Sequence, residues 1–412
     1  MHYQFLTLIF AKNIIPMEAF PEMTGTHYAA EKKTILSLCN NRKGYCIADL
    51  ARHLDTSIPK VTRIVSEMMA DGYLVELGKI ESSGGRRASL FGLNPDVGYF
   101  VGVHVGHEGL TVAVTDFPGN VLHTVENISF SLENTEKSVH ELAVLVHSCL
   151  ESLQMDLTKI AAYGVDLTGR VNHQTGYSYS YFISEQKPIR ALLEYEFGRP
   201  VVVENDTRAM AWGEYVCGVA GDEGTILFLN VGWGLGMGMV LDGKLFYGKS
   251  GFSGEVGHFP LLNNNQYCRC GPIGCLETGA SGLALHRLVT EKLAEGRTSV
   301  LSPAFKKGEE ITLDSILSAI DKEDVLVIEC IEEVGATLGH SLAGLINIFN
   351  PDLVIIGGRL SRTERYLLPP LRSAVNKYSL NIVNNDTHIK VSQLGRTAGH
   401  CTQTFVNNNP VY

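Results

Sequence analysis

The chain has no apolar run long enough to cross a membrane. Its apolar N-terminal stretch, residues 5–11, is far shorter than the roughly 18 residues that a transmembrane helix requires. The same stretch lacks a basic leader and a convincing cleavage site. We therefore expect neither secretion nor a membrane partner. We interpret residues 1–27 as an N-terminal arm that is either disordered or the product of a misassigned start codon.

The composition is not that of a disordered or disulfide-bonded protein. Hydrophobic residues make up 45% of the chain and charged residues 19%, and there is no low-complexity tract. Nine cysteines are an odd number, and three of them lie close together at metal-ligand spacing. This pattern indicates reduced thiols rather than a disulfide framework. We expect a globular, cytoplasmic protein without disulfides.

Length and charge indicate two or three domains of unequal character. A chain of 412 residues exceeds one ordinary core, since domains usually contain about 100 to 200 residues. Residues 31–90 contain ten basic and seven acidic side chains, a net charge of +3, which leaves −13 for the rest of a chain whose net charge is −10. The asymmetry permits nucleic-acid binding by the N-terminal part only.

The N-terminal part has the pattern of three short helices followed by a hairpin. Residues 28–39 have a helical pattern, and apolar residues recur at three- and four-residue intervals through 47–54. Pro59 suits a first helical position, and the third helix ends at Gly72. Its predicted buried stripe consists of Val61, Ile64, Val65 and Met68. Two strands, residues 73–75 and 88–91, complete the module.

This order of elements is typical of a winged helix-turn-helix that reads DNA. The third helix would enter the major groove and the basic hairpin tip would reach the backbone or the minor groove. The predicted DNA-binding residues are Lys60, Thr62, Arg63 and Ser66 on the helix and Arg86 and Arg87 at the tip. Two alternatives stay open. The module serves dimerisation or protein docking, or Lys60 and Arg63 are ordinary surface charges.

A histidine and three cysteines have the spacing of a metal site. His258 precedes Cys268, Cys270 and Cys275 by ten, twelve and seventeen residues, with glycines between the cysteines. Imidazole and thiolate ligands suit tetrahedral Zn²⁺, and four protein ligands would close its shell. We therefore predict a structural zinc rather than a catalytic one. Glu255 and Glu277 flank the cluster, and we expect both to accept hydroxyl hydrogens.

The rest of the chain alternates apolar strands with helical stretches. Strands are predicted at 100–103, 110–114, 225–229, 238–241 and 353–358, and a helix at 138–153. The second set of strands begins well after the first, which indicates two similar α/β lobes with a cleft between them.

These motifs together resemble the ROK family, a group of repressors, open reading frames and sugar kinases. The similarity is to its repressors of the xylose and N-acetylglucosamine type, and it spans about residues 28 to 405. It is carried by residues 82–87, Glu204-Asn205-Asp206, the glycine-rich loop at Gly234, Glu255 with His258, the cysteine segment ending at Glu277, and Asn350-Pro351 before Gly357-Gly358.

The resemblance implies a fold and a division into domains. The expected fold is an N-terminal winged helix-turn-helix joined to a two-lobed α/β, actin-like (ribonuclease H-like) sugar-kinase body. The expected domains are the DNA-binding domain at 28–95, a small lobe at 98–213 completed by a helix at about 394–408, and a large lobe with the zinc motif at 214–393. Family members usually assemble as dimers or dimers of dimers, so a homodimer or homotetramer is expected.

The resemblance also implies which residues bind a sugar. Asn205 and Asp206 match sugar-hydroxyl contacts of the family, and Asp206 matches the catalytic base of its kinases. Glu255, His258 and Glu277 match further sugar contacts, with His258 also a zinc ligand. Such carboxylates and amides grip hydroxyls through charge-assisted hydrogen bonds. Helix capping by Asp206 is the structural alternative.

The nucleotide loops decide between repressor and kinase. The family's kinases open with Asp-x-Gly-Gly-Thr-Lys, whereas residues 104–109 read His-Val-Gly-His-Glu-Gly, and Trp233 stands in the second loop where kinases carry a small hydroxyl residue. We therefore predict a sugar-responsive repressor that binds operator DNA, with neither ATP nor phosphorylation. The alternatives are a DNA-tethered sugar kinase and a repressor controlled by a protein partner.

Overall fold

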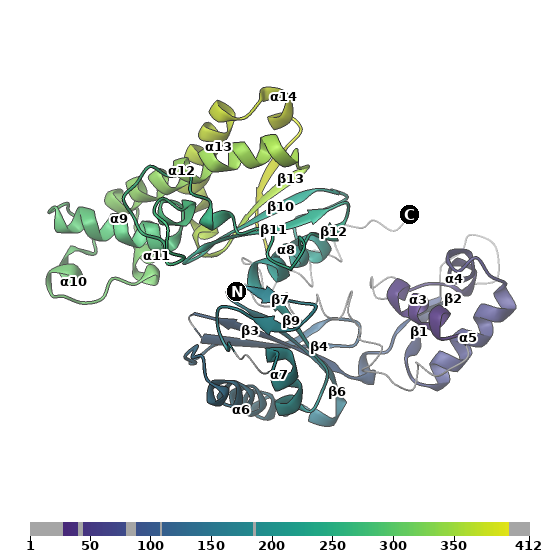
Figure 1. The fold of residues 1–412 in the computed structure, drawn as a ribbon. Coiled ribbons are helices and arrows are strands. Elements are labelled where there is room, and N and C mark those ends of the chain that lie inside the picture. The colour runs from purple at the N-terminus through teal and green to yellow at the C-terminus, as the bar shows by residue number, and fades with distance from the viewer. Residues whose placement is uncertain (1–27, 40–43, 80–87, 108, 184–186, 395–412) are drawn as a thin grey trace. The chain divides into compact units, whose positions relative to one another are not determined.

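The computed structural model describes residues 28–39, 44–79, 88–107, 109–183 and 187–394 (Figure 1). They form two compact units that divide between Ala209 and Met210. We call the described residues up to Ala209 the N-terminal unit and those from Met210 onward the C-terminal unit. Three predictions lie outside the described residues: the arm at 1–27, the wing tip with Arg86 and Arg87, and residues 395–408 of the C-terminal helix.

The N-terminal unit begins with three helices and a hairpin, in the order predicted from the sequence. They are α3 (Ala29–Cys39), α4 (Ile47–His53), α5 (Ile58–Ala70), β1 (Leu74–Lys79) and β2 (Ser89–Leu93). Pro59 lies in the first turn of α5, where a missing N–H costs no hydrogen bond. The predicted stripe of Val61, Ile64, Val65 and Met68 is buried, so α5 turns its opposite face outward.

The first five-stranded sheet follows in the same unit, with strand order β5-β4-β3-β6-β9. The strands are β3 (Tyr99–Gly106), β4 (Gly109–Asp116), β5 (Val121–Ile128), β6 (Ile160–Leu167) and β9 (Val201–Asn205). Strands β3, β6 and β9 are parallel, and β4 and β5 are antiparallel. Helices α6 (Glu136–Ser152) and α7 (Ile189–Phe197) cover one face of this sheet (Figure 1). A small ribbon of β7 (Val171–Asn172) and β8 (Tyr177–Ser178) precedes α7.

The side chains of β3 alternate between the two faces of the first sheet, and each face packs into a different hydrophobic core. Val101, Val103 and Val105 pack against the layer of α6 and α7. Because side chains of a strand alternate between its faces, Phe100 and His104 share the opposite face. Phe100 there joins the core of the N-terminal helices.

The helical module and the sheet therefore share one apolar core. Phe117, fully buried after β4, stacks on Phe100 with ring centroids 6.0 Å apart and meets Tyr73, just before β1, at 6.3 Å. Tyr73 and Phe100 are also buried. The module is thus attached to the sheet by packed aromatic side chains as well as by the covalent chain.

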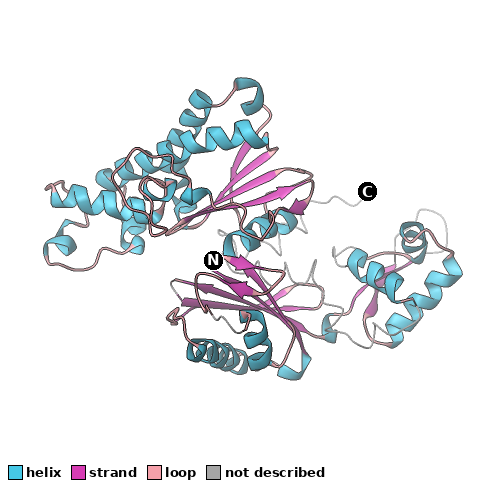
Figure 2. Ribbon diagram, in the orientation of Figure 1, coloured by secondary structure: helices cyan, strands magenta, loops and turns pink. Residues whose placement is uncertain are grey.

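The C-terminal unit contains a second five-stranded sheet with the same pattern. Its order is β12-β11-β10-β13-β14, with β10, β13 and β14 parallel and the other two antiparallel (Figure 2). The strands are β10 (Ile226–Val231), β11 (Leu235–Leu241), β12 (Lys244–Leu245), β13 (Leu353–Gly357) and β14 (His388–Val391). The repeated topology supports a two-lobed α/β body, although no repeat is evident in the sequence.

Helices pack on both faces of the second sheet. One face carries α9 (Gly282–Ala294), α11 (Leu313–Asp321), α12 (Val325–Phe349) and α13 (Glu364–Tyr378), and the short helices α10 (Ser302–Lys306) and α14 (Asn381–Asn384) follow in the same unit. The other face packs on α8 (Asp206–Cys217) through Met210 and Ala211. Glu214 of α8 is fully buried and accepts hydrogen bonds from the Ser392 hydroxyl and the Val219 N–H. Within the described residues, no helix has the length and apolarity needed to span a bilayer.

The aromatic joint yields a stability prediction. Replacing Phe117 with alanine should destabilise the N-terminal unit by about 3–5 kcal/mol, because a buried ring is removed and a cavity remains. Tyr195→Ala is the control, since Tyr195 is 85% exposed and its replacement should change stability by less than about 0.5 kcal/mol. Chemical denaturation of the full chain measures both. Equal effects of the two variants would contradict a core shared by module and sheet.

Candidate functional site

A sharp turn from strand to helix presents the first pair of predicted site residues. Strand β9 ends at Asn205 and α8 begins at Asp206. The Asn205 side-chain oxygen accepts a hydrogen bond from the Arg208 N–H at 3.0 Å, so Asn205 caps the helix. Its Nδ2 donates to the Gly169 carbonyl and to Asp206 Oδ1, both at 2.8 Å. The capping role considered for Asp206 therefore belongs to its neighbour.

The Asp206 carboxylate is fixed through one oxygen. Oδ1 accepts hydrogen bonds from Asn205 Nδ2 and from the Thr207 N–H, the latter at 2.6 Å. Among the described residues, Oδ2 has no hydrogen-bond partner. Burial and, to a smaller extent, the Asp166 carboxylate raise the pKa of Asp206 to about 6, while His104 and the hydrogen bonds from Thr207 oppose the rise. The group is therefore oriented, has one open acceptor oxygen and titrates near neutral pH.

Sequence reasoning missed the pairing of His104 with Asp166. His104 Nδ1 lies 2.5 Å from Asp166 Oδ1, and both side chains are buried. The two residues are 62 positions apart and become neighbours because β3 and β6 pair in parallel with His104 opposite Asp166. No spacing in the sequence signals this contact. Only the register of the two strands would have revealed it.

The predicted metal ligands do come together in the C-terminal unit. The ligand atoms of His258, Cys268, Cys270 and Cys275 all lie within 4.8 Å of one another. His258 Nδ1 is 3.5 Å from Cys268 Sγ, and Cys270 Sγ is 3.5 Å from Cys275 Sγ. Zinc bonds of about 2.0 to 2.3 Å in a tetrahedron would separate such atoms by about 3.6 to 3.8 Å. The donor set thus fits a four-coordinate metal ion.

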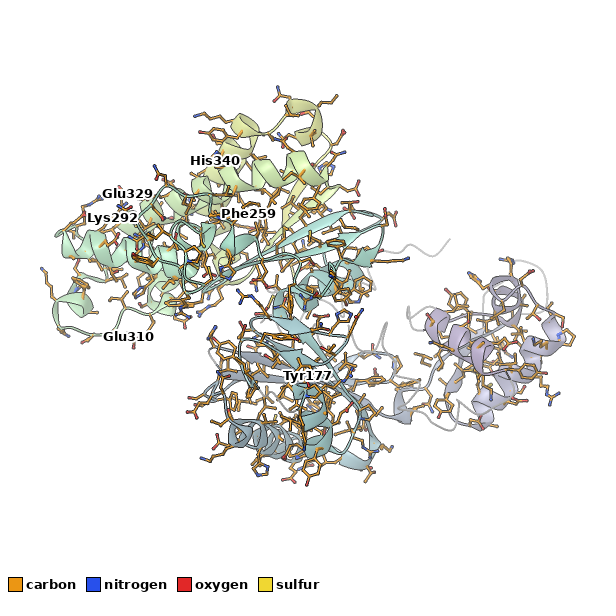
Figure 3. The ribbon with its side chains drawn as sticks, viewed as in Figure 1. Tyr177, Phe259, Lys292, Glu310, Glu329 and His340 are labelled. Carbon is orange, nitrogen blue, oxygen red and sulfur yellow. The ribbon has the colours of Figure 1, made fainter. Side chains whose placement is uncertain are left out.

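Tight backbone turns hold these four side chains. The Cys268 N–H donates to the Pro272 carbonyl and the Gly271 N–H donates to the Cys268 carbonyl, both at 2.9 Å. Gly274 has φ +82°, and a Cβ there would lie 2.2 Å from the Leu262 carbonyl oxygen, so no side chain fits. Phe259, half-exposed and labelled in Figure 3, follows His258 directly. Burial raises the pKa of the Cys268 thiol to about 12, so the thiol keeps its proton unless a cation binds beside it.

The two predicted carboxylates adjoin the cysteine cluster in different ways. Glu255 Oε2 lies 3.6 Å from His258 Nε2, the ring nitrogen not directed at Cys268. Glu277 Oε2 accepts a hydrogen bond from the Leu235 N–H at 3.1 Å, and its Oε1 lies 3.8 Å from Cys268 Sγ. The cluster therefore orients both carboxylates, one through the histidine and one through a thiol.

The predicted DNA-binding residues of α5 are less uniform than the sequence suggested. Thr62, Arg63 and Ser66 are exposed. Lys60 is half-buried rather than fully outward, because its Nζ lies 2.7 Å from Glu31 Oε1 and 5.1 Å from the centre of the Tyr28 ring. Arg63 Nε donates to Glu67, one helical turn along α5, at 3.1 Å. Both cations are therefore paired within the module.

Residues 100–403 match the family described as ROK, which covers both sheets. The chain belongs to the ROK family. It is 31% identical over 351 residues to the xylose repressor of Caldicellulosiruptor bescii, covering 84% of this chain and 87% of the relative. It is 28% identical over 350 residues to the regulator NagC of Escherichia coli, covering 84% of each.

Solved structures of ROK proteins agree in fold. A ROK family transcriptional regulator, described as a homologue of the E. coli Mlc protein, matches with a TM-score of 0.71 and 27% identity over 84% of this chain and 87% of its own. A ROK glucokinase from Streptomyces griseus, solved with glucose and AMPPNP, matches with a TM-score of 0.63 and 27% identity over 74% of this chain and 96% of its own. The two-lobed α/β fold expected from the sequence is therefore confirmed.

Hydrogen bonds connect the second glycine-rich loop, at Gly232 and Trp233, to helix α9. The Gly282 and Leu283 N–H groups, at the start of α9, donate to the carbonyls of Gly232 and Trp233 at 2.7 and 3.0 Å. The next N–H of the helix, that of Ala284, donates to Ser281 Oγ at 3.2 Å. Helix N-termini bind phosphates through such N–H groups. Here three of them already have partners inside the protein.

The raised pKa of Asp206 predicts a stability effect. A carboxyl whose folded pKa lies above its unfolded value destabilises the fold once ionised, so the penalty is present above pH 6 and disappears as the pH falls toward 4. Asp206→Asn should therefore stabilise the protein at pH 7.5 by roughly 1 to 3 kcal/mol and give no gain near pH 4. Thermal unfolding at several pH values tests this, with the exposed Asp222→Asn as control. A gain that does not depend on pH would contradict it.

Proposed function

We propose that this protein is a sugar-responsive transcriptional regulator, most simply a repressor of genes for carbohydrate uptake or catabolism. One observation carries the proposal. The glucokinase match covers 96% of that enzyme but 74% of this chain, whereas the regulator match reaches 84% of this chain. The residues before the ROK match at 100–403 contain the three helices and the hairpin, which share a core with the first sheet. A metabolic kinase does not need this module, and a DNA-binding regulator does.

The N-terminal module is the proposed winged helix-turn-helix, with α5 as the recognition helix. Its exposed Thr62, Arg63 and Ser66 are the side-chain types that contact bases and phosphates. Lys60 and Arg63 now pair with Glu31 and Glu67, and both would exchange these partners for phosphate oxygens on DNA. The wing residues Arg86 and Arg87 are proposed as phosphate contacts on the same basis of residue type.

The proposed effector is a sugar bound through hydroxyl contacts. In the N-terminal unit, Asp206 offers an open Oδ2, and Asn205 holds the carboxylate in place. In the C-terminal unit, the proposed contacts are Glu255, His258 and Glu277. Oriented carboxylates suit polyols, since each oxygen accepts a charge-assisted hydrogen bond from a hydroxyl group.

The proposed metal is one structural zinc ion held by His258, Cys268, Cys270 and Cys275. Three thiols and an imidazole are the donors that zinc prefers, and four protein ligands leave no open position for catalysis. If Nδ1 binds the metal, Nε2 stays available for Glu255 or a sugar hydroxyl. The metal would then fix the carboxylates without contacting the sugar.

Sugar kinase activity is the second candidate, because Asp206 is retained and its pKa near 6 suits a general base. Two features argue against it. The first nucleotide loop, residues 104–109, lacks the kinase aspartate, threonine and lysine, and Trp233 stands in the second loop where kinases carry a small hydroxyl residue. We therefore propose that the sugar is bound but not phosphorylated.

The proposal also includes self-association of the chain, with control by a protein partner as an alternative to control by a free sugar. Exposed apolar side chains gather at the ends of α12 to α14, namely Ile348, Tyr378, Leu380 and Ile382, which supports a homodimer or homotetramer. Control by a protein partner instead of a free sugar is the alternative. Operator release on addition of sugar alone to the pure protein would distinguish the two.

The function is tested with a sugar panel. Free, N-acetylated and phosphorylated sugars should be screened by thermal shift, since a ligand that binds only the folded state raises the melting temperature. We expect one class to bind, to release the operator and to cause no consumption of ATP in a coupled assay. ATP turnover at enzyme-like rates with that sugar would overturn the regulator proposal in favour of the kinase.

The zinc proposal is tested by metal analysis. Pure protein should contain one zinc per chain, and Cys270→Ser should lose the metal and the sugar response together. Cys217→Ser, at a half-buried cysteine outside the cluster, should keep both. A wild-type protein that has no zinc yet binds sugar would contradict the assignment.

The DNA proposal is tested by salt dependence. The double variant Arg86→Ala with Arg87→Ala should weaken operator binding, and the slope of log K against log salt should become shallower by about 0.9 for each phosphate that is no longer neutralised. Arg63→Ala should instead change the preference among operator sequences. The double variant Lys306→Ala with Lys307→Ala removes the same charge from exposed positions of the C-terminal unit and should leave both quantities unchanged. Unchanged operator affinity in the wing variant would contradict a winged DNA reader.

A further inference from the structure

A buried histidine contacts one carboxylate, Asp166, on the strand beside the one that leads into Asp206. His104 Nδ1 contacts Asp166 Oδ1 at 2.5 Å, with 5% and 3% of the two residues exposed. Asp166 and the turn that begins at Asp206 lie at the carboxyl ends of the parallel strands β6 and β9, which pair directly. Two carboxylates in a region of low dielectric repel each other unless a cation is near.

Two further charged groups of this region, Glu204 and Arg208, form an ion pair with each other. Arg208 Nε donates to Glu204 Oε1 at 2.8 Å, and Arg208 Nη2 donates to the Val171 carbonyl at 2.7 Å. Glu204 and Arg208 thus form a buried ion pair of their own. Burial lowers the pKa of His173, and the charges of Glu204 and Arg208 act on it in opposite directions. Among the ionisable groups that act on Asp206, Asp166 opposes its charge and His104 favours it.

The backbone leaves room for the imidazole in this position. A Cβ on Gly106 would lie 2.6 Å from His104 Nε2, so glycine at 106 allows the ring to lie beside the end of β3. The main chain therefore permits an orientation in which Nδ1 points at Asp166. The position of the ring and its short contact with Asp166 indicate an imidazole that is held in one orientation rather than a loosely packed core histidine.

We infer that His104 is a charge-balancing, positioning residue. When it is protonated, its imidazole offsets the charge of Asp166 and so favours Asp206 as a carboxylate that accepts sugar hydroxyls. The sugar part of this inference rests on the proposed function. Among the described residues, the groups with metal-ligand geometry are the four around Cys268, in the C-terminal unit.

The inference is tested with charge-neutral variants. His104→Gln keeps a hydrogen-bond donor but removes the charge, and the pKa of Asp206, followed by carboxyl NMR, should rise above its wild-type value. Asp166→Asn should lower it. The double variant, with both charges removed, should return close to wild type. His123→Gln, at an exposed histidine of β5, is the matched control and should change nothing.

A second readout measures sugar affinity at pH 7.5. We expect His104→Gln to weaken binding about tenfold, the order of one charge-assisted contact, and the double variant to recover most of the affinity. If His104 has only a structural role, the losses of sugar affinity caused by His104→Gln and by Asp166→Asn should add in the double variant. An unchanged pKa of Asp206 in His104→Gln, or additive damage in the double variant, overturns the inference.

The proposed sugar binding and the proposed charge balance at His104 can be contradicted independently of each other. If wild-type protein binds no sugar while the Asp206 pKa rises in His104→Gln, the sugar proposal is wrong and the charge balance stands. If His104→Gln does not fold, the double variant decides, because charge balance predicts that it folds and a packing role predicts that it does not.

Discussion

The hydrogen bonds of Asn205 are the constraint on which the candidate site depends. One amide group caps α8, ties β9 to the Gly169 carbonyl and fixes one oxygen of Asp206. The carboxylate is therefore positioned by a helix start rather than by a loop, which keeps its open oxygen in a defined direction. The same helix runs on into the C-terminal unit, since the two units divide within α8.

The cysteine cluster plays the corresponding part in the C-terminal unit. Short-range turns bring four ligand atoms together, and the flanking Glu255 and Glu277 are oriented through His258 and Cys268. In both units, neighbouring side chains hold the carboxylates that are proposed to contact a sugar. Such supporting contacts would keep the proposed sugar-binding groups in place while the nucleotide loops diverge.

Features that depend on residues close together in the sequence could be predicted, and contacts between residues far apart in the sequence could not. The stripe of α5 and the cysteine cluster follow from spacings within one helix or one loop, and the structure has both. The contact of His104 with Asp166 depends on strand register across 62 residues, and the pairing of Lys60 with Glu31 spans two helices. Neither leaves a periodic signal. The capping by Asn205 was within reach, because the residue stands directly before the helix, but Asp206 beside it is an equally good capping residue type.

The central claim is that sugar binding and operator binding are coupled in one protein. Titrating the identified sugar into free protein and into the protein–operator complex measures this coupling directly. The account predicts that operator weakens sugar binding by the same factor by which sugar weakens operator binding, about 5- to 150-fold for a coupling of about 1–3 kcal/mol. Equal sugar affinity with and without operator, for a sugar that does bind the free protein, would contradict it.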